Sequence, residues 1–146
     1  ALAADGRFEV ITLCGRDHRL QRRLGALGAG RAVGWTDRVP SYLAAADVVV
    51  ENAGGLSSLE AFCARVPVVS FEPIPGHGRD NVRAMVRAGV TTAPQDHAAL
   101  CDAVARLAHD PVERDRQLAA VDKMFAGDPI DDILRTIGDG VRAGRP

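Results

Sequence analysis

The stretch Asp47-Val-Val-Val-Glu-Asn-Ala-Gly-Gly-Leu-Ser-Ser-Leu-Glu60 decides how this chain folds. It runs from a short apolar strand through two glycines into a helix that opens with two serines. Such a junction leaves backbone N–H groups unpaired at the helix N-terminus, where the helix dipole favours an anion. Gly54 and Gly55 let a bulky ligand approach the backbone, because neither residue has a Cβ. The stretch therefore predicts an anion-binding turn between a strand and a helix.

Apolar runs and helical patterns alternate on both sides of this stretch, as is typical of βαβ units with a parallel sheet. Strands are expected at Phe8–Cys14, Arg31–Gly34, Asp47–Val50, Val68–Phe71 and Val90–Thr92. Helices are expected near Asp17–Ala26, Val39–Ala45, Ser57–Ala64, Asn81–Ala88 and Asp96–Ala108, with two more that begin at Pro111 and Pro129. The apolar runs are continuous, so we expect strands covered on both faces. The fold class is α/β, a single domain over residues 1–146 with a Rossmann-like, doubly wound parallel sheet.

Composition narrows the classes of function. The formal net charge of −1 over 146 residues gives no general attraction to nucleic acid, so we expect no nucleic-acid partner. The three cysteines form no C-x-x-C pair, which argues against a disulfide framework or a zinc site and favours a reducing cytosol. No cluster of ligating side chains has the spacing of a metal site, so we expect no metal.

A second loop, Pro73-Ile-Pro-Gly-His-Gly-Arg-Asp-Asn81, follows the next apolar strand. Loops at the carboxyl ends of successive parallel strands converge on one crevice, which is the usual ligand site of an open α/β sheet. We interpret this crevice as a nucleotide-sugar pocket. On this loop His77 either faces solvent or contacts a sugar hydroxyl or a phosphate, and we favour the contact.

Several other sequence features allow two interpretations each. Ser57-Ser-Leu-Glu60 is a capping-box pattern with Ser57 as N-cap, yet Glu60 is also placed to bind both hydroxyls of a ribose. Arg79, Arg83 and Arg87 share one helix face, which is either simply solvated or meets anionic lipid headgroups or an acceptor phosphate. The glycines of Gly25–Gly30 are in the wrong order for a dinucleotide fingerprint and indicate a helix C-terminus.

Five blocks taken together resemble, in order and spacing, the C-terminal half of glycosyltransferase family 28, over about residues 8 to 110. The blocks are Val10–Arg16, Gly34–Val39, Leu43–Asp47, Ala53–Glu60 and Pro73–Asn81. The resemblance implies the C-terminal half of a GT-B fold and an inverting, metal-independent hexosyltransferase that uses a UDP-sugar as co-substrate, without a cofactor. It implies transfer to an acceptor hydroxyl, lipid-linked as in the glycolipid-forming members of the family.

The family's functional residues carry over to matching positions of this sequence. The backbone around Trp35 and Thr36 would meet uracil, and Glu60 the ribose. The diphosphate would be held by residues of the glycine-serine turn, namely Gly54, Gly55, Ser57 and Ser58. Gly15 and Arg16 would border the nucleotide. The donor sugar would be contacted by residues of the second loop, namely Gly76, His77 and Asn81.

The sequence also departs from the family. His77 and Gly78 replace a Gln-Glu pair that contacts the donor sugar, and Asn52 stands where galactolipid synthases often carry Lys, so the resemblance does not identify the sugar. The first strand of the family's domain, with its phosphate-binding loop, has no counterpart before Phe8. The N-terminal acceptor domain, which supplies the catalytic base, is also absent from these residues. We therefore assign no catalytic residue here and expect a fragment that is inactive alone.

The expected partners are a UDP-sugar, an N-terminal acceptor-binding domain and an anionic membrane surface. The expected location is cytoplasmic, peripheral at the inner face of the membrane. Two other functions share these features. One is a non-catalytic, UDP-sugar-binding subunit of a split transferase, and the other is a GT-B enzyme similar to UDP-sugar 2-epimerases.

Overall fold

The computed structural model describes residues 1–127 of the chain, so the helix expected from Pro129 lies outside the described residues. Short strands and helices alternate, as the sequence predicts. In chain order the elements are α1 (Leu2–Asp5), β1 (Ile11–Leu13), α2 (His18–Ala26), β2 (Arg31–Val33), α3 (Val39–Ala44), β3 (Val49–Glu51), α4 (Leu56–Cys63), β4 (Val68–Ser70), α5 (His77–Ala88), α6 (His97–His109) and α7 (Pro111–Met124).

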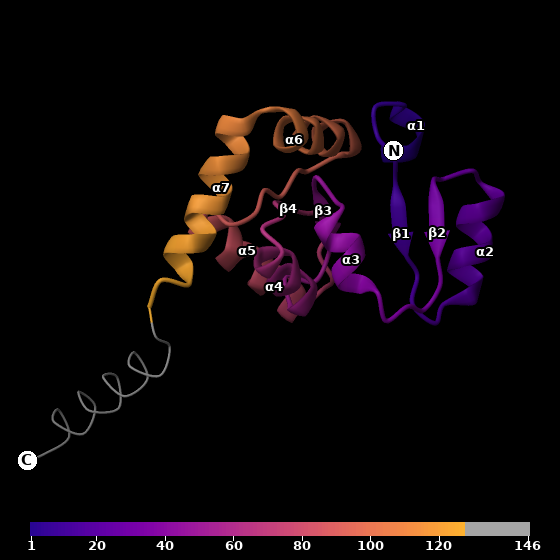
Figure 1. Ribbon diagram of the computed structural model, residues 1–146, viewed down its shortest axis with the longest axis horizontal. Helices are drawn as coiled ribbons and strands as arrows, with labels where there is room; N and C mark the ends of the chain where they lie inside the picture. The colour runs from indigo at the N-terminus through magenta and orange to yellow at the C-terminus, as the bar shows by residue number, and fades with distance from the viewer. Residues whose placement is uncertain (128–146) are drawn as a thin grey trace, which may run out of the picture.

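The strands form two parallel pairs. Strand β1 pairs with β2, and β3 pairs with β4, with Val50 opposite Val69. The segment expected as a fifth strand, Val90–Thr92, makes only an isolated parallel bridge between Val69 and Thr92, so the prediction of a full strand there is wrong. Figure 1 shows α2 beside β2, and α4 and α5 grouped near β3 and β4. Both pairs are parallel and joined through helices, which confirms the α/β class.

Strand β4 lies at the centre of the core. Its successive side chains point to opposite faces of the sheet, so neighbouring residues pack into two different clusters. Val68 packs in one cluster with residues of α4, α5 and α7, among them Phe62, Met85 and Val121. Val69 packs on the other face with Leu100 and other residues of α6. Helices therefore cover both faces of this strand, as a doubly wound sheet requires.

The other strand pair is less well covered. In β1 the side chains of Ile11 and Leu13 are 42% and 38% exposed, so the expectation that every strand is covered on both faces is wrong here. A cavity of about 450 Å³ lies between the two pairs, lined by Ile11 on one side and by Val48 and Val50 on the other. Among the described residues, no ladder of backbone hydrogen bonds joins one strand pair to the other. The cavity lies where a continuous doubly wound sheet would have hydrogen bonds between neighbouring strands.

Side-chain caps set the start of several helices. Asp17 accepts the N–H groups of Arg19 and Leu20 at the start of α2, and Asp96 accepts that of Ala99 at the start of α6. Asp110 performs the same role ahead of Pro111 at the start of α7. Each capping carboxylate satisfies amides that the first turn leaves unpaired. Helix α2 ends before Gly28, which confirms the glycine-rich segment as a helix C-terminus.

Candidate functional site

The loop between β3 and α4 adopts a left-handed conformation at Gly54, which glycine favours over residues with a side chain. Its φ is +59°, in the left-handed region. A Cβ at this position would lie 2.9 Å from the Cβ of Asn81 and 3.0 Å from the backbone nitrogen of Val82. Gly54 therefore brings the start of α4 into direct contact with helix α5. The N–H of Gly54 donates to the Glu51 carboxylate at 2.6 Å, so this amide is already engaged in the structure.

Helix α4 begins one residue earlier than the sequence indicates. Gly55 is the N-cap and makes no side-chain cap, so the prediction of Ser57 as N-cap is wrong. The N–H groups of Gly55, Leu56 and Ser57 have no hydrogen-bond acceptor among the described residues. Gly55 is open to solvent, since a Cβ there would meet no atom within 4 Å. These three amides are therefore the ones available to hold an anion.

The two serines of this turn differ in accessibility. Ser57 is exposed, whereas Ser58 is only 1% exposed. The Ser58 hydroxyl has no hydrogen-bond partner among the described residues. Of the two hydroxyls expected at the diphosphate, only that of Ser57 faces solvent in this structure.

The second loop lies against the first. The N–H of Ile74 donates to the carbonyl of Asn52 at 2.8 Å, and Gly78 packs against the side chain of Ile74. Helix α5 begins at His77 rather than near Asn81, so the placement of His77 on a loop is wrong. Gly76, with φ +82°, is the N-cap of α5, and His77 is an exposed first-turn residue. The N-termini of α4 and α5 thus meet at the carboxyl ends of β3 and β4.

Arg16 and Trp35 form a second part of the site at the carboxyl ends of β1 and β2. The Arg16 guanidinium lies 5.9 Å from the centroid of the Trp35 ring, in a cation–π contact. Gly15 turns the chain after β1 with φ +56°, and Thr36 accepts the N–H of Arg38 through its hydroxyl at 3.0 Å. Trp35 is 63% exposed, so its ring is free to stack on a ligand.

Glu60 lies on α4 and lines a cavity of about 530 Å³ between α3 and α4. Val39 and Pro40, at the start of α3, form part of the opposite wall. Since Val39 follows Thr36 by three residues, the cavity extends from Glu60 toward the segment expected at uracil. The capping-box alternative for Glu60 finds no support, because no cap bond from its side chain to α4 is present.

The structure therefore groups the predicted residues in two sets. One set joins the turn of Gly54–Ser58 to Gly76, His77 and Asn81 through direct packing. The other set joins Arg16 to Trp35. No hydrogen bond between described residues connects the two sets, and both lie at carboxyl ends of strands, where open α/β sheets bind ligands.

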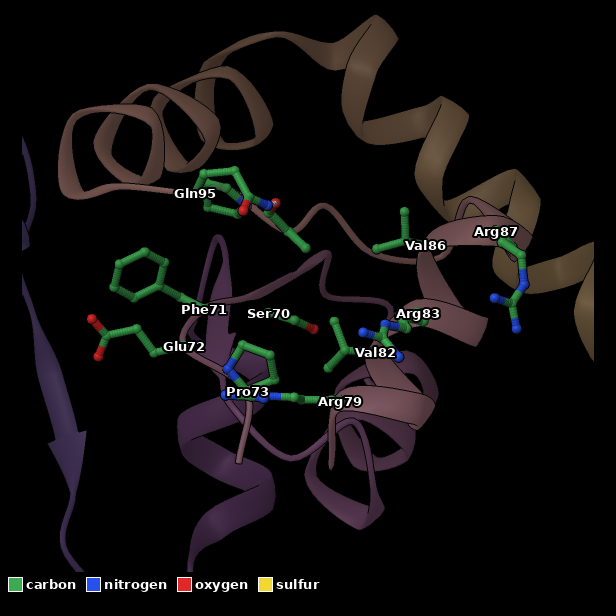
Figure 2. A pocket seen from close by; sticks show the side chains of 12 residues that line it. Ser70, Phe71, Glu72, Pro73, Arg79, Val82, Arg83, Val86, Arg87 and Gln95 are labelled. Carbon is green, nitrogen blue, oxygen red and sulfur yellow. Dashed lines mark hydrogen bonds between the residues drawn. The ribbon is translucent and has the colours of Figure 1, made fainter. Parts of the chain in front are cut away.

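A further cavity of about 530 Å³ adjoins the second loop, and it was not predicted as a pocket. Figure 2 shows its apolar part, with Phe71 and Pro73 after β4 on one side and Val82 and Val86 of α5 on the other. The three arginines of the α5 stripe, Arg79, Arg83 and Arg87, also line it. Among residues 1–127, the ion pair that involves one of these arginines is the weak, exposed contact between Arg83 and Asp80 at 3.4 Å.

Sequence reasoning missed Glu51, the last residue of β3. Its carboxylate accepts the N–H of Ala53 at 2.7 Å and that of Gly54, and the Ser70 hydroxyl also donates to it. The sequence carries no clear signal for this role, because it depends on Ser70, which lies nineteen residues further along the chain. Among the described residues no group of three His, Cys, Asp or Glu side chains is arranged to hold a metal ion.

Together the two parallel strand pairs and the helices that join them form a Rossmann-like α/β domain. The family described as "Glycosyl transferases group 1" matches residues 3–110. Because this match covers most of the chain, the chain belongs to that family, and the prediction of a glycosyltransferase is confirmed.

Relatives of known name agree with the family. Over 114 residues the chain is 25% identical to the "Processive diacylglycerol beta-glucosyltransferase" of Bacillus subtilis (strain 168), a match that covers 75% of the chain and 30% of that protein. It is 22% identical over 135 residues to the protein of the same name from Bacillus cereus (strain ATCC 10987 / NRS 248), covering 89% of the chain and 35% of the relative. The chain thus spans about a third of the length of these relatives.

A solved structure supports the fold. The crystal structure of the glycotransferase of kitacinnamycin matches with a TM-score of 0.60 and 25% identity, over 83% of this chain and 32% of that one. Because the chain aligns with about a third of that glycotransferase, the prediction that it forms a Rossmann-like part of a larger glycosyltransferase fold is confirmed. Within the described part of the chain, no helix has the length and apolar character needed to cross a membrane.

Proposed function

We propose that this chain is the donor-binding part of an inverting, metal-independent glycosyltransferase that takes its sugar from a UDP-sugar. One observation carries the proposal: the loop that leads into α4 packs on the N-terminal half of α5 at the carboxyl edge of β3 and β4. Gly54 lies against Asn81, and Gly78 in the first turn of α5 lies near the carbonyls of Asn52 and Ala53. Two helix N-termini at one point combine free amides with two positive dipole ends, which is an arrangement suited to a diphosphate.

The chemistry follows from this arrangement. The free amides of Gly55, Leu56 and Ser57 would bind the diphosphate, and the two dipole ends would stabilise the negative charge that develops on departing UDP. Glu60 would accept the ribose hydroxyls, and uracil would lie by Trp35. A general base must lie within hydrogen-bond reach of the acceptor hydroxyl, and we place that base outside these residues. Attack on the face opposite the leaving UDP then inverts the anomeric carbon.

The names of the relatives guide the choice of substrates. Their name specifies glucose as the donor sugar and diacylglycerol as the acceptor. His77 and buried Gly78 change the sugar-contacting positions expected for the family, so several UDP-sugars belong in the test.

The test is release of UDP by the full-length protein supplied with UDP-glucose, UDP-galactose or UDP-N-acetylglucosamine, with and without diacylglycerol in detergent micelles. We expect release from at least one donor that depends on the acceptor. Acceptor-dependent turnover of an ADP- or GDP-sugar in place of every UDP-sugar would contradict the proposal.

We further propose that the arginine-lined cavity faces an anionic membrane surface. Its support is the combination of an apolar wall with three arginines, which suits a phosphate headgroup and the start of an acyl chain. Replacing Arg79, Arg83 and Arg87 by Gln should abolish sedimentation with phosphatidylglycerol vesicles. The control replaces Arg19, Arg22 and Arg23, three exposed arginines of α2, and should sediment as the wild type does. Equal loss in both triple variants would contradict a specific role for the α5 arginines.

A further inference from the structure

Glu51 is a carboxylate placed inside a site that is expected to bind an anion. It ends β3 and is only partly exposed. One oxygen, Oε2, accepts two backbone amides, from Ala53 at 2.7 Å and from Gly54 at 2.6 Å. The other oxygen, Oε1, accepts the hydroxyl of Ser70 at the end of β4. The side chain thus connects the turn to two strands at once.

The Ser70 end of this connection is fixed deep in the core. Ser70 is fully buried, and its hydroxyl lies 3.1 Å from that of Thr91, which is itself 5% exposed. The Thr91 hydroxyl donates to the carbonyl of Val68 at 3.0 Å. Each hydroxyl carries one proton, so Ser70 donates to Glu51 while Thr91 donates to Val68, and the contact between the two hydroxyls adds no third hydrogen bond. The bond from Ser70 therefore connects Glu51 to the buried end of β4.

We propose that Glu51 is a positioning residue, which fixes the Ala53–Gly54 turn so that the next three amides remain free for the donor diphosphate. The inference rests on the proposed function, because it concerns the same site. By binding the amides of Ala53 and Gly54, the carboxylate determines which part of the turn bonds to the protein and which part faces the ligand. It also holds Gly54 in the left-handed conformation that permits the contact with Asn81.

Substitution of Glu51 by glutamine separates the effect of its hydrogen bonds from the effect of its negative charge. In Glu51→Gln the amide oxygen can accept from Ala53 and Gly54, and the amide nitrogen can donate to the Ser70 hydroxyl. The Ser70 hydroxyl can then donate to Thr91, which keeps its bond to Val68. The contacts of Glu51 with the turn and with Ser70 are therefore kept, with the direction of the Ser70 bond reversed, and the Ser70 proton becomes free to bond Thr91. Removal of a negative charge beside the diphosphate also favours binding, so this variant should bind UDP at least as tightly as the wild type.

In Glu51→Ala all three bonds are lost. The turn must then be ordered when the ligand binds, and ordering one further backbone residue lowers affinity by a factor of about ten. The matched control is Glu9→Ala, which removes an exposed carboxylate just before β1, at the end of the strands away from the site, and changes net charge equally. We expect Glu9→Ala to leave UDP affinity within about twofold of the wild type, as single exposed charges contribute little.

The experiment measures UDP affinity by calorimetry on the full-length wild type and these three variants, together with thermal midpoints and amide exchange at Ala53 and Gly54. We expect weakened UDP binding and fast exchange at both amides in Glu51→Ala, with both properties restored in Glu51→Gln. Equal loss of affinity in Glu51→Gln and Glu51→Ala would overturn the inference, since hydrogen-bond position would not be the cause. Unchanged affinity in Glu51→Ala would overturn it as well.

Two further results distinguish a failure of the proposed function from a failure of the positioning role of Glu51. A wild type that does not bind UDP would overturn the proposed function, while slow exchange at Ala53 and Gly54 that Glu51→Ala abolishes would still establish the positioning of the turn. If Glu51→Ala does not fold, Ser70→Ala removes the Oε1 contact and the contact with Thr91 but keeps both amide bonds to Oε2, and it should weaken UDP binding less than tenfold. Wild-type affinity in that folded variant would then contradict the role of the Ser70 bond.

Discussion

Replacing Gly54 by alanine should destabilise the domain more than any other glycine-to-alanine change in the site. The new Cβ would lie 2.9 Å from the Asn81 Cβ and 3.0 Å from the Val82 nitrogen, in a residue whose φ is +59°. The left-handed conformation costs a residue with a side chain about 1–2 kcal/mol. Forcing packed elements apart costs a further ~1–3 kcal/mol. We therefore expect the free energy of unfolding to fall by about 2–5 kcal/mol, a large part of the ~5–15 kcal/mol typical of a domain.

Urea denaturation followed by circular dichroism measures this change. Two control variants separate its causes. Gly28→Ala has a similar φ of +60° and no atom within 4 Å of its Cβ, so it should show only the backbone cost of ~1–2 kcal/mol. Gly55→Ala has neither a positive φ nor a close neighbour, and replacing this N-cap glycine should cost less than about 1 kcal/mol. A Gly54→Ala variant no less stable than Gly28→Ala would refute the close packing of α5 on this turn.

Three further predictions concern the core, the nucleotide and pH. Buried Gln117 accepts the N–H of Val68 at 2.8 Å, so Gln117→Leu should lower the free energy of unfolding by about 1–3 kcal/mol in urea, while exposed Gln95→Leu should have little effect. Trp35 is the only tryptophan, so UDP should change its fluorescence and ADP should not; identical responses to both nucleotides would count against uracil stacking there. Hydrogen bonds from Arg7 lower the pKa of Asp5 from an ordinary value of 3.8 to about 2. Stability from this pair is therefore present above pH 4 and should be lost as pH falls toward 2, and Asp5→Asn should remove that part of the pH dependence of the thermal midpoint.

The sequence predicted the order of elements well, because apolar periodicity and capping residues act locally. The carboxylates of Asp17, Asp96 and Asp110 begin helices where the pattern places them. The continuous apolar run of β4 correctly indicated a strand covered on both faces. Val90–Thr92 shows the limit of this reasoning, since an apolar run does not determine how many ladder bonds a segment finds.

Helix boundaries at the site were harder to predict, because tertiary contacts set them. A capping-box pattern placed the start of α4 at Ser57, but the packing of Gly54 on Asn81 leaves Gly55 as the N-cap. The following helix was expected near Asn81, but α5 begins at His77, where buried Gly78 packs closely against Ile74 in the first turn. Glu51 was missed because its role depends on Ser70, nineteen residues away.

The most direct test of the account is calorimetric titration of the full-length protein with UDP, in parallel with ADP and GDP, for the wild type and for Glu60→Ala. The control is Glu9→Ala, an exposed carboxylate just before β1, at the opposite edge of the sheet from the site. The account predicts preferential binding of UDP, weakened at least tenfold by Glu60→Ala and unchanged by Glu9→Ala. Equal affinity for the three nucleotides, or UDP binding that is insensitive to Glu60→Ala, would contradict it.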